Sequence, residues 1–404
     1  MTRYVVIGNG VAGVTAAQAI AQSQPGADLH VYAAEPYPYY RRPQLPDYIA
    51  GLVTEDDITY RPPQWYAERG IQVHLNCPVV ELDAAAYRLR LADGTDVPYD
   101  RLLLAMGGVA WMPPVEGVDR RGVFTLRTLD DARTIRAWAR ESRQAVVVGG
   151  GLLGLETARA LRALGLEVTV LEVAPYLMPR QLDREGAAVL EILIHRMGIR
   201  TETGVVTEAV LGDSAVRAVR LKDGREFPAD LVVFSAGIRP EVTLARQAGL
   251  VVNRGVVVDK YLQTSAPDIY AAGDVAEANG IVYGIVPAAI EQARVAAANL
   301  VSPGSAVYRG TIPTTTLKVV GAELTSIGEC VMEADDLVQL RRADPQQGRY
   351  RKLAMRDGRI VGAILLNERE HTSAIRQLLE RGTDVSAYTD LLLEENPDWK
   401  RLLA

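Results

Sequence analysis

The strongest constraint on the fold of this 404-residue chain is a sequence pattern that occurs twice. Residues 3–13 read RYVVIGNGVAG, and residues 145–154 read AVVVGGGLLG. Each copy is a short apolar run, then a glycine-rich turn, then a stretch rich in alanine and leucine at helical spacing. A second apolar run that ends in a carboxylate follows each copy, at residues 29–35 and 167–172. The repeat predicts two strand–helix–strand units of the Rossmann type.

The glycines of such a unit have three different tasks. The first permits a tight turn, the second lets the backbone approach a pyrophosphate, and the third lets the helix pack on the strand. Phosphates then lie at a helix N-terminus, where free N–H groups and the helix dipole favour anions. The sequence places these glycines at Gly8, Gly10 and Gly13, and again at Gly149, Gly151 and Gly154. One loop of this kind is a weak signal, but two complete units predict two bound dinucleotides.

A carboxylate at the end of the second strand accepts hydrogen bonds from ribose hydroxyls. Glu35 and Glu172 have this position in the two units. Glu172 also bears on the choice of nicotinamide cofactor, because a carboxylate repels the 2′-phosphate of NADPH. The residues after Glu172 are Val-Ala-Pro and supply no cation, so the sequence favours NADH over NADPH.

The composition excludes several other kinds of protein. A net charge of −6 argues against a general nucleic-acid binder. Two cysteines, Cys77 and Cys330, are too few for a disulfide framework or a cysteine-ligated cluster, and we interpret both as buried, inert thiols. Four histidines scattered singly along the sequence predict no metal site. Because no stretch approaches 18 consecutive apolar residues, we expect a cytoplasmic protein without membrane insertion.

Several local signals outside the repeat predict further elements. Asp-Gly pairs at residues 93–94 and 223–224 lie between apolar runs and predict hairpins. Thr128 and Asp131 have the spacing of a capping box at the start of a helix.

The C-terminal part has a different character. From about residue 308, apolar segments separated by turn signals predict an antiparallel meander. Two short helices are expected after it, near residues 370–381 and 390–403.

With these features in place, the chain resembles the two-dinucleotide flavoproteins of the pyridine-nucleotide oxidoreductase family over about residues 4–301. Beyond the loops, the resemblance rests on LAMG at residues 104–107, SAG at 235–237 and DIYAAGD at 268–274. It implies an α/β fold of the glutathione-reductase type, with FAD on the first unit and NAD(P)H on the second. The predicted domains are an FAD domain of residues 1–110 and 235–305, a Rossmann-like NAD(P)H domain of residues 111–234, and a small C-terminal α+β domain of residues 306–404.

The resemblance also implies roles for single residues. Asp274 would hold the ribityl chain of FAD, although it could instead be the N-cap of a helix that begins at Val275. Pro287 would open a helix whose N-terminus faces the pyrimidine end of the flavin. The other residues that it assigns are Glu35, Arg42, Pro43, Val79, Ala105 and Gly107 for FAD, and Gly237 for NADH.

Residues 35–51, EPYPYYRRPQLPDYIAG, resemble the NADH–rubredoxin reductases and the flavin-binding part of assimilatory nitrite reductases. Many family members relay electrons through a cysteine pair on the first FAD helix, which this sequence lacks, so the acceptor must approach the flavin itself. Arg42 stands where these reductases place a basic residue, usually lysine, beside the isoalloxazine; the alternative is a solvated loop arginine. Glu156 extends the second loop to GxGxxGxE. It either orients the nicotinamide carboxamide or stabilises a helix N-terminus.

Together these features predict an oxidoreductase in which NADH passes a hydride to FAD and the reduced flavin supplies a small electron carrier, rubredoxin or ferredoxin. Such carriers are commonly acidic, and Arg41, Arg42 and Arg61 are candidates for a basic rim that steers them. One alternative is a reductase of quinones or other diffusible acceptors, for which residues 391–403 are the candidate membrane anchor. Another is a flavoprotein that senses NADH without turnover. The sequence leaves open the identity of the carrier and whether the protein is a homodimer.

Overall fold

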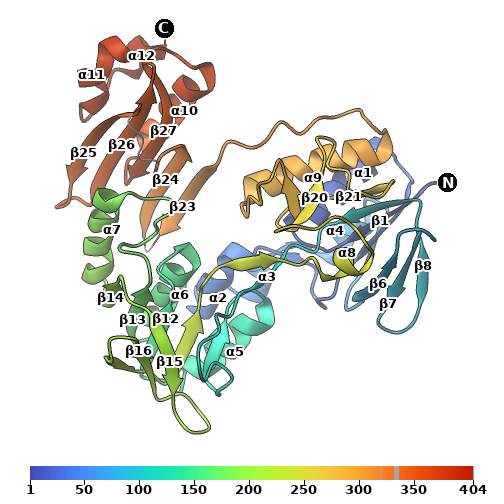
Figure 1. The fold of residues 1–404 in the computed structure, drawn as a ribbon, viewed down its shortest axis with the longest axis horizontal. Helices are drawn as coiled ribbons and strands as arrows, with labels where there is room; N and C mark the ends of the chain where they lie inside the picture. The colour runs from blue at the N-terminus through green and yellow to red at the C-terminus, as the bar shows by residue number, and fades with distance from the viewer. Residues whose placement is uncertain (320, 332–335, 404) are drawn as a thin grey trace. The chain divides into compact units, whose positions relative to one another are not determined.

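The computed structural model describes residues 1–319, 321–331 and 336–403. Its contacts divide the chain into two compact units, whose elements Figure 1 labels. Unit 1 consists of Met1–Arg42, Val53–Ala110 and Gly237–Thr311, and unit 2 of Pro43–Leu52, Trp111–Ala236 and Ile312–Ala404. Residues 320, 332–335 and 404 of the predicted C-terminal domain lie outside the described residues.

Unit 1 is built on a five-stranded parallel sheet with the strand order β21-β9-β1-β2-β5. The strands are β1 (Arg3–Ile7), β2 (Asp28–Tyr32), β5 (Ile71–His74), β9 (Arg101–Leu104) and β21 (Ile269–Ala271). Helices α1 (Val11–Ser23) and α9 (Val286–Val301) pack against each other and on this sheet. Val6 and Leu103 are fully buried, as expected for strands covered on both faces. The first predicted strand–helix–strand unit and the helix opened by Pro287 are confirmed.

Shorter elements complete unit 1. The predicted hairpin at residues 93–94 is confirmed as the turn between β7 (Arg88–Leu91) and β8 (Asp96–Pro98), where Gly94 has a φ of +88°. The short strands are β3 (Tyr39–Tyr40), β4 (Thr59–Arg61), β6 (Val79–Asp83), β7 (Arg88–Leu91), β8 (Asp96–Pro98), β10 (Gly108–Ala110), β19 (Ile238–Pro240), β20 (Val256–Val258) and β22 (Ala276–Ala278). The short helices are α3 (Glu55–Ile58), α4 (Pro63–Ala67) and α8 (Thr243–Gln247).

Unit 2 contains the second repeat as another parallel sheet, with the order β11-β18-β12-β13-β14. The strands are β11 (Val123–Thr125), β12 (Gln144–Val148), β13 (Glu167–Glu172), β14 (Ile199–Thr203) and β18 (Leu231–Phe234). The helices are α2 (Leu45–Ile49), α5 (Leu129–Ala139), α6 (Leu152–Ala163) and α7 (Arg184–Arg196). The capping box predicted at Thr128 and Asp131 is confirmed at the start of α5.

A three-stranded antiparallel sheet accompanies this second parallel sheet in unit 2. Its strands are β15 (Thr207–Leu211), β16 (Ala218–Leu221) and β17 (Glu226–Pro228). The turn between β16 and β17 is the hairpin predicted at residues 223–224, which is confirmed.

The C-terminal part of unit 2 is a five-stranded antiparallel sheet with helices on it (Figure 1, red). Its strands are β23 (Thr314–Val319), β24 (Ala322–Gly328), β25 (Val338–Asp344), β26 (Arg349–Arg356) and β27 (Arg359–Leu366). The order β23-β24-β27-β26-β25 corrects the predicted meander, because β24 pairs with β27 rather than with β25. The first predicted helix is α10 (Thr372–Arg381), but the second is two helices, α11 (Thr389–Leu393) and α12 (Trp399–Leu403). Pro397 lies between these two and lacks the N–H that a continuous helix needs.

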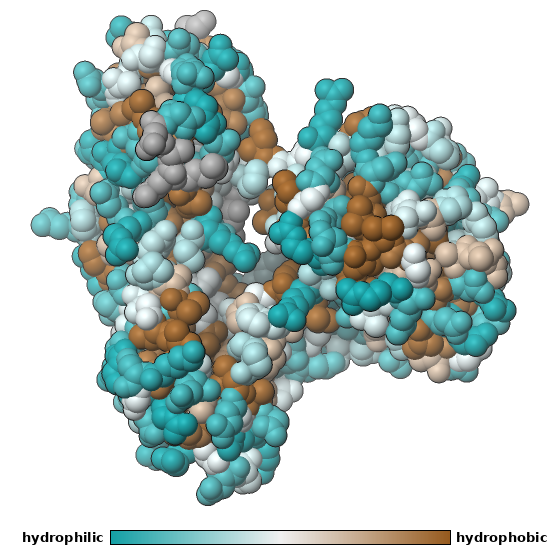
Figure 2. Space-filling model, in the orientation of Figure 1, coloured by the Kyte–Doolittle hydropathy of each residue, from teal (hydrophilic) through white to brown (hydrophobic). Residues whose placement is uncertain are grey.

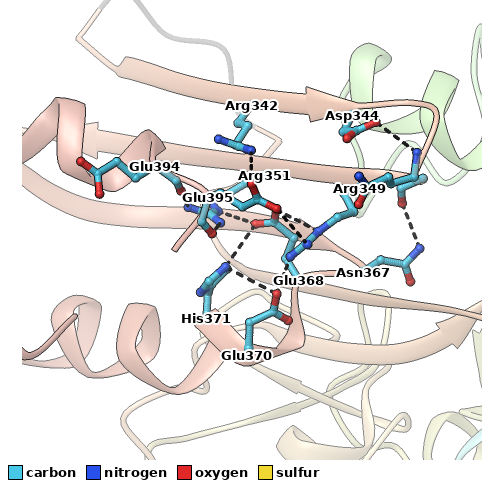
Figure 3. Close-up of polar contacts among 12 residues, drawn as sticks. Arg342, Asp344, Arg349, Arg351, Asn367, Glu368, Glu370, His371, Glu394 and Glu395 are labelled. Atoms are coloured by element: carbon cyan, nitrogen blue, oxygen red, sulfur yellow. Dashed lines mark hydrogen bonds and ion pairs between the residues drawn. The ribbon is translucent and has the colours of Figure 1, made fainter. Parts of the chain in front are cut away.

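Strand β26 carries two neighbouring cations that are both fully buried, Arg351 and Lys352. Because successive strand residues point to opposite faces, each meets different partners. The Arg351 guanidinium pairs with Glu368 and donates to the carbonyl oxygens of Leu392, at 3.0 Å, and Glu394, at 2.9 Å (Figure 3). Arg351 therefore anchors the C-terminal segment on its own sheet.

The visible face of this domain is mainly hydrophilic (Figure 2).

On the other face of β26, Lys352 lies against the start of α7. Its ammonium is 3.3 Å from Oδ2 of Asp183, the N-cap residue of that helix. Tyr350, also fully buried, donates its hydroxyl to the same oxygen at 2.8 Å. These contacts join the C-terminal sheet to the helix that follows β13 of the second parallel sheet, within unit 2.

Candidate functional site

The first glycine loop, between β1 and α1, has the geometry that its three predicted tasks require. Gly8 has a φ of +109°, and a Cβ there would lie 2.2 Å from the carbonyl oxygen of Ala105. A Cβ on Gly13 would lie 1.9 Å from the carbonyl oxygen of Gly8. At Gly10, by contrast, no described residue other than Gly10 and its immediate chain neighbours has an atom within 4 Å of the position of a Cβ. The open side of the loop is therefore at the N-terminus of α1, where a phosphate would find free N–H groups.

Buried donors near this loop support the fit of a dinucleotide. Asn9, within the loop, accepts from the Tyr66 hydroxyl at 2.9 Å through Oδ1. Its Nδ2 has no hydrogen-bond partner among residues 1–319, 321–331 and 336–403, and neither has Nε of Arg42. Buried N–H groups are almost always bonded, so these two donors fit a ligand with oxygen acceptors. Asn9 and Tyr66 were not predicted from the sequence, although Asn9 stands between two loop glycines.

Glu35 and Arg42, predicted to serve different parts of FAD, contact each other. Oε1 of Glu35 pairs with the Arg42 guanidinium, and Oε2 accepts from the Tyr40 hydroxyl at 2.6 Å. Burial raises the pKa of Tyr40 to about 12, so it is a hydroxyl donor at neutral pH. The alternative of a solvated loop arginine is wrong, because the Arg42 side chain is 32% exposed and ion-paired. Its role beside the isoalloxazine stays a prediction.

Asp274 lies in the turn between β21 and β22, half-buried, directly after Gly273. The alternative that it caps a helix at Val275 is wrong, because the chain continues into β22. The Gly273 N–H donates to Gln292 Oε1 on α9 at 2.8 Å, which ties this turn to the helix opened by Pro287. The turn at Gly273 thus fixes the Asp274 carboxylate between β21 and β22.

The remaining residues predicted for FAD are spread over unit 1 and its boundary. Ala105 follows β9 and faces the first loop through its carbonyl, and Gly107 has a φ of +72°. Val79 begins β6 in an antiparallel sheet. Pro43 is the first residue of the chain that belongs to unit 2.

The second glycine loop repeats the geometry of the first. A Cβ on Gly149 would lie 2.3 Å from the carbonyl oxygen of Ser235, and one on Gly154 would lie 2.0 Å from that of Gly149. Gly151, the N-cap of α6, has no neighbour within 4 Å in the part of the chain that the structure describes. A second open helix N-terminus is thus present in unit 2. Gly237, also predicted for NADH, begins the last segment of unit 1.

Glu172 faces the second glycine loop and also binds its backbone. Its side chain accepts from the N–H of Gly150 at 2.5 Å through Oε2 and from the N–H of Ala174 at 2.7 Å through Oε1. The residue is 8% exposed. Each carboxylate oxygen has a further lone pair, so contact with a ribose is compatible with these bonds. The sequence had indicated the ribose contact and not the bonds to the loop.

Glu156 lies in the second turn of α6 and is ion-paired. Its Oε2 accepts from Nε of Arg159 at 2.9 Å, and Arg159 also pairs with Asp47 on α2. Glu156 is the fifth residue of the helix, beyond the first turn in which the helix dipole acts most strongly. This position weakens the alternative of an N-terminal helix carboxylate. Neither Arg159 nor Asp47 was predicted, since they are 112 residues apart in sequence.

An arginine–aromatic surface on unit 1 consists of the exposed Arg41, Tyr60 and Arg69 and the half-buried Arg61 and Trp65. The guanidinium carbons of Arg41 and Arg61 lie 3.9 and 4.0 Å from the ring centroid of Tyr60. Those of Arg61 and Arg69 lie 4.7 and 4.6 Å from that of Trp65. Tyr60 is 40% exposed. Of the three arginines predicted for a basic rim, Arg41 and Arg61 are here, whereas Arg42 is bound to Glu35.

The cysteines agree in part with the predictions, and two of the histidines form a pair that the sequence did not indicate. Both cysteines are free, and burial raises the pKa of the Cys330 thiol, as expected for an inert group. Cys77 is half-buried rather than buried. His30 and His74, which are far apart in sequence, lie on the paired strands β2 and β5 with Nδ1 of His30 3.0 Å from Nε2 of His74. Within the described ranges, no group of three or more potential metal ligands is placed to hold an ion.

Comparison with known proteins identifies the family. Residues 2–299 match the family model described as pyridine nucleotide-disulphide oxidoreductase. The chain belongs to this family. Residues 313–383 match the rubredoxin NAD+ reductase C-terminal domain, so the predicted branch of the pyridine nucleotide-disulphide oxidoreductases is confirmed. The family binds FAD and uses NAD(P)H.

Among solved structures, a ferredoxin reductase from Rhodopseudomonas palustris has a TM-score of 0.90 and 29% identity, with all of both chains covered. A ferredoxin–NAD+ reductase component of the biphenyl dioxygenase system of Paraburkholderia xenovorans is 32% identical over 98% of this chain and 97% of its own length. An NAD(P)H nitrite reductase of Bacillus subtilis is 37% identical over 95% of this chain. The chain spans 48% of that nitrite reductase, about half its length. The α/β fold predicted from the sequence is confirmed.

No helix within residues 1–319, 321–331 and 336–403 is both long and apolar enough to cross a membrane.

Proposed function

We propose that this chain is an FAD-dependent NADH reductase that passes electrons to a small carrier protein of the ferredoxin or rubredoxin type. The observation that carries the proposal is the pair of complete glycine loops, each open at its second glycine. The two cysteines of the sequence, Cys77 and Cys330, lie outside both loops and their helices, so electrons would leave without a thiol relay. The ferredoxin–NAD+ reductase relative supports a protein carrier as acceptor.

The first loop would hold the FAD diphosphate. Gly10 leaves the space, and Asn9 and Arg42 offer donors without other partners among the described residues. Glu35 would accept from ribose hydroxyls, and Asp274 would hold the ribityl chain. When bound, FAD supplies a ring that takes up two electrons as a hydride and releases them singly.

The second loop would hold NADH. Gly151 leaves the space for its diphosphate, and Glu172 would accept from the adenosine ribose. A carboxylate fixed by two backbone N–H groups cannot turn away from a 2′-phosphate, which supports a preference for NADH over NADPH. Glu156 would orient the nicotinamide carboxamide, so the protein's task in this half-reaction is positioning rather than proton transfer.

The arginine–aromatic surface would receive the carrier. The rings of Tyr60 and Trp65 restrain the positions of the guanidinium groups, and those of Arg41 and Arg69 belong to exposed residues. Arginine and large aromatic residues are also those that contribute most to the affinity of protein interfaces. An acidic carrier would be attracted to such a surface over about a Debye length.

The quinone-reductase alternative loses support from the C-terminal segment. Its proposed anchor packs on the domain itself, with Leu392 fully buried and Leu402 4% exposed. Trp399 donates Nε1–H to Nδ1 of the buried His371 at 3.0 Å. The cytoplasmic location stays a prediction.

Anaerobic titration with NADH, followed by oxidation with rubredoxin, ferredoxin, a quinone or oxygen, tests the function. We expect one equivalent of NADH to bleach the flavin and a carrier protein to restore its colour fastest. Fastest reoxidation by the quinone or by oxygen would contradict the proposal.

A charge-reversed double variant, Arg41→Glu with Arg61→Glu, tests the surface. It should lower kcat/KM for the carrier by about tenfold or more at low ionic strength, with a smaller effect at high salt. NADH oxidation with ferricyanide should be unchanged. Arg133→Glu, an exposed arginine on α5, is the matched control. Equal carrier kinetics in the double variant and the control would refute this surface.

A further inference from the structure

Helix α2 is separated in sequence from the rest of unit 2, yet it packs within it. The chain leaves unit 1 after Arg42, forms residues Pro43–Leu52 in unit 2, and returns to unit 1 at Val53. Leu45 and Ile49 of α2 are 1% and 0% exposed, and the helix contacts α5 and α6. The segment that follows the predicted FAD residue Arg42 is therefore part of the domain that carries the second glycine loop.

One arginine joins this segment to the second loop's helix. The Arg159 guanidinium contacts Glu156 Oε2 through Nε at 2.9 Å and through Nη2 at 2.8 Å, and it also pairs with Oδ1 of Asp47. The side chains of Arg159 and Glu156 are 17% and 15% exposed, and that of Asp47 is 36% exposed. Burial alone would lower the pKa of Arg159, but Asp47 and Glu156 raise it, so the cation is held between two carboxylates.

The arrangement needs the planar fork of an arginine. A guanidinium has five N–H donors and can bridge two carboxylates, whereas an ammonium is a single charged point. Without the cation, Asp47 and Glu156 would be two like charges in one partly buried site, which favours their separation. Arg159 thus fixes the direction of Glu156 and the position of α2 at the same time.

We propose that Arg159 is a positioning residue that couples occupancy of the second glycine loop to α2 and thereby to the segment that continues from Arg42. Glu156 is five residues from Gly151, about 7.5 Å along the helix axis, so a dinucleotide at the loop restrains both. The restraint passes through Arg159 to Asp47. The identity of the dinucleotide as a nicotinamide cofactor rests on the proposed function.

A second contact between α2 and its neighbours provides a matched control. The Arg136 guanidinium of α5 lies 5.0 Å from the ring centroid of Tyr48 on α2. It holds the same segment through a different side chain from Arg159. Arg136→Met should loosen α2 and leave its response to a bound dinucleotide intact.

Hydrogen–deuterium exchange of the FAD-loaded protein, with and without NAD+, tests the coupling. In the wild type, NAD+ should slow exchange both at residues 149–156 and at residues 43–52. In Arg159→Met, protection of 149–156 should persist and that of 43–52 should be lost. In Arg136→Met both should persist. Equal protection of 43–52 in Arg159→Met and the wild type would overturn the coupling.

A wild-type result separates this inference from the proposed function. Protection of 149–156 without protection of 43–52 would overturn the coupling and leave NADH binding intact. Protection of neither segment would overturn both. Arg159→Lys keeps the charge and distinguishes loss of the ion pair from a folding defect in Arg159→Met. It should restore part of the protection of residues 43–52, since a lysine can pair with one carboxylate at a time.

Steady-state kinetics give a second readout. In Arg159→Met, Glu156 is no longer held in direction, and kcat with NADH should fall by about tenfold because small errors of orientation are costly in rate. The KM for NADH should change less. A rise in KM at constant kcat would mean that Arg159 contributes to binding alone and would overturn the positioning role.

Discussion

Replacing Asp183 by asparagine should strongly destabilise unit 2. Asparagine has nearly the same volume as aspartate and keeps the N-cap acceptor. In the wild type this acceptor, Oδ1 of Asp183, lies 3.0 Å from the Gly186 nitrogen. The substitution removes the negative charge 3.3 Å from the fully buried ammonium of Lys352. Leaving one partner of a buried ion pair uncompensated costs about 3–5 kcal/mol. For a unit of this size the unfolding midpoint should fall by about 2–4 °C per kcal/mol, or roughly 6–20 °C.

Thermal unfolding followed by circular dichroism measures this loss. Asp213→Asn, an exposed aspartate in the same unit, is the control and should change the free energy of unfolding by less than about 0.5 kcal/mol. Adding Lys352→Met to Asp183→Asn should recover part of the stability, because the unpaired cation is removed. A loss below about 1 kcal/mol in Asp183→Asn, or no recovery in the double variant, would refute the reasoning.

The same pair predicts a pH dependence. Burial would raise the pKa of Asp183, but the Gly186 N–H, the Tyr350 hydroxyl and Lys352 hold it below its usual value. A carboxyl group with a lowered folded pKa stabilises the fold fully above its unfolded pKa of about 3.9. The stability difference between wild type and Asp183→Asn should therefore be constant above about pH 5 and shrink as the pH falls below 4. A difference that grows on acidification would contradict the assignment.

Three further variants test the dinucleotide sites. Gly13→Ala should abolish FAD retention, because its Cβ would lie 1.9 Å from the Gly8 carbonyl oxygen; normal flavin absorbance per protein would exclude this role. Asp274→Ala should lose FAD on purification, and a fully flavinated variant would refute the ribityl contact. Glu172→Arg should shift the ratio of kcat/KM from NADH towards NADPH by about tenfold, the size of one charge-assisted contact exchanged for a repulsion. An unchanged ratio would mean that another residue selects the cofactor.

Local sequence signals predicted the parts of the fold that local physics determines. The two glycine loops, the Asp-Gly hairpins and the capping box at Thr128 each depend on residues within a few positions of one another. A glycine is favoured where a turn needs a positive φ, and a threonine three residues before an aspartate is typical of a helix start. The family resemblance then predicted which cofactor each loop would bind.

Pairings between distant segments were beyond such signals. Asp47 and Arg159 are 112 residues apart, and His30 and His74 meet only because β2 and β5 are neighbours in the sheet. The placement of β24 beside β27 likewise depends on strand order, which alternation of apolar residues does not encode. Arg42 illustrates the same difficulty within seven residues, because its partner Glu35 was already assigned to a ribose.

The two buried cations of β26 have a consequence for how this sheet can assemble. Arg351 finds Glu368 and backbone carbonyls on one face, and Lys352 finds Asp183 on the other. If the strand slipped by one residue against its neighbours, Arg351 and Lys352 would exchange faces, and each buried cation would lose the partners that it has in this register. Two adjacent buried cations on opposite faces of one strand thus specify its register. Apolar residues alone would specify that register less strictly.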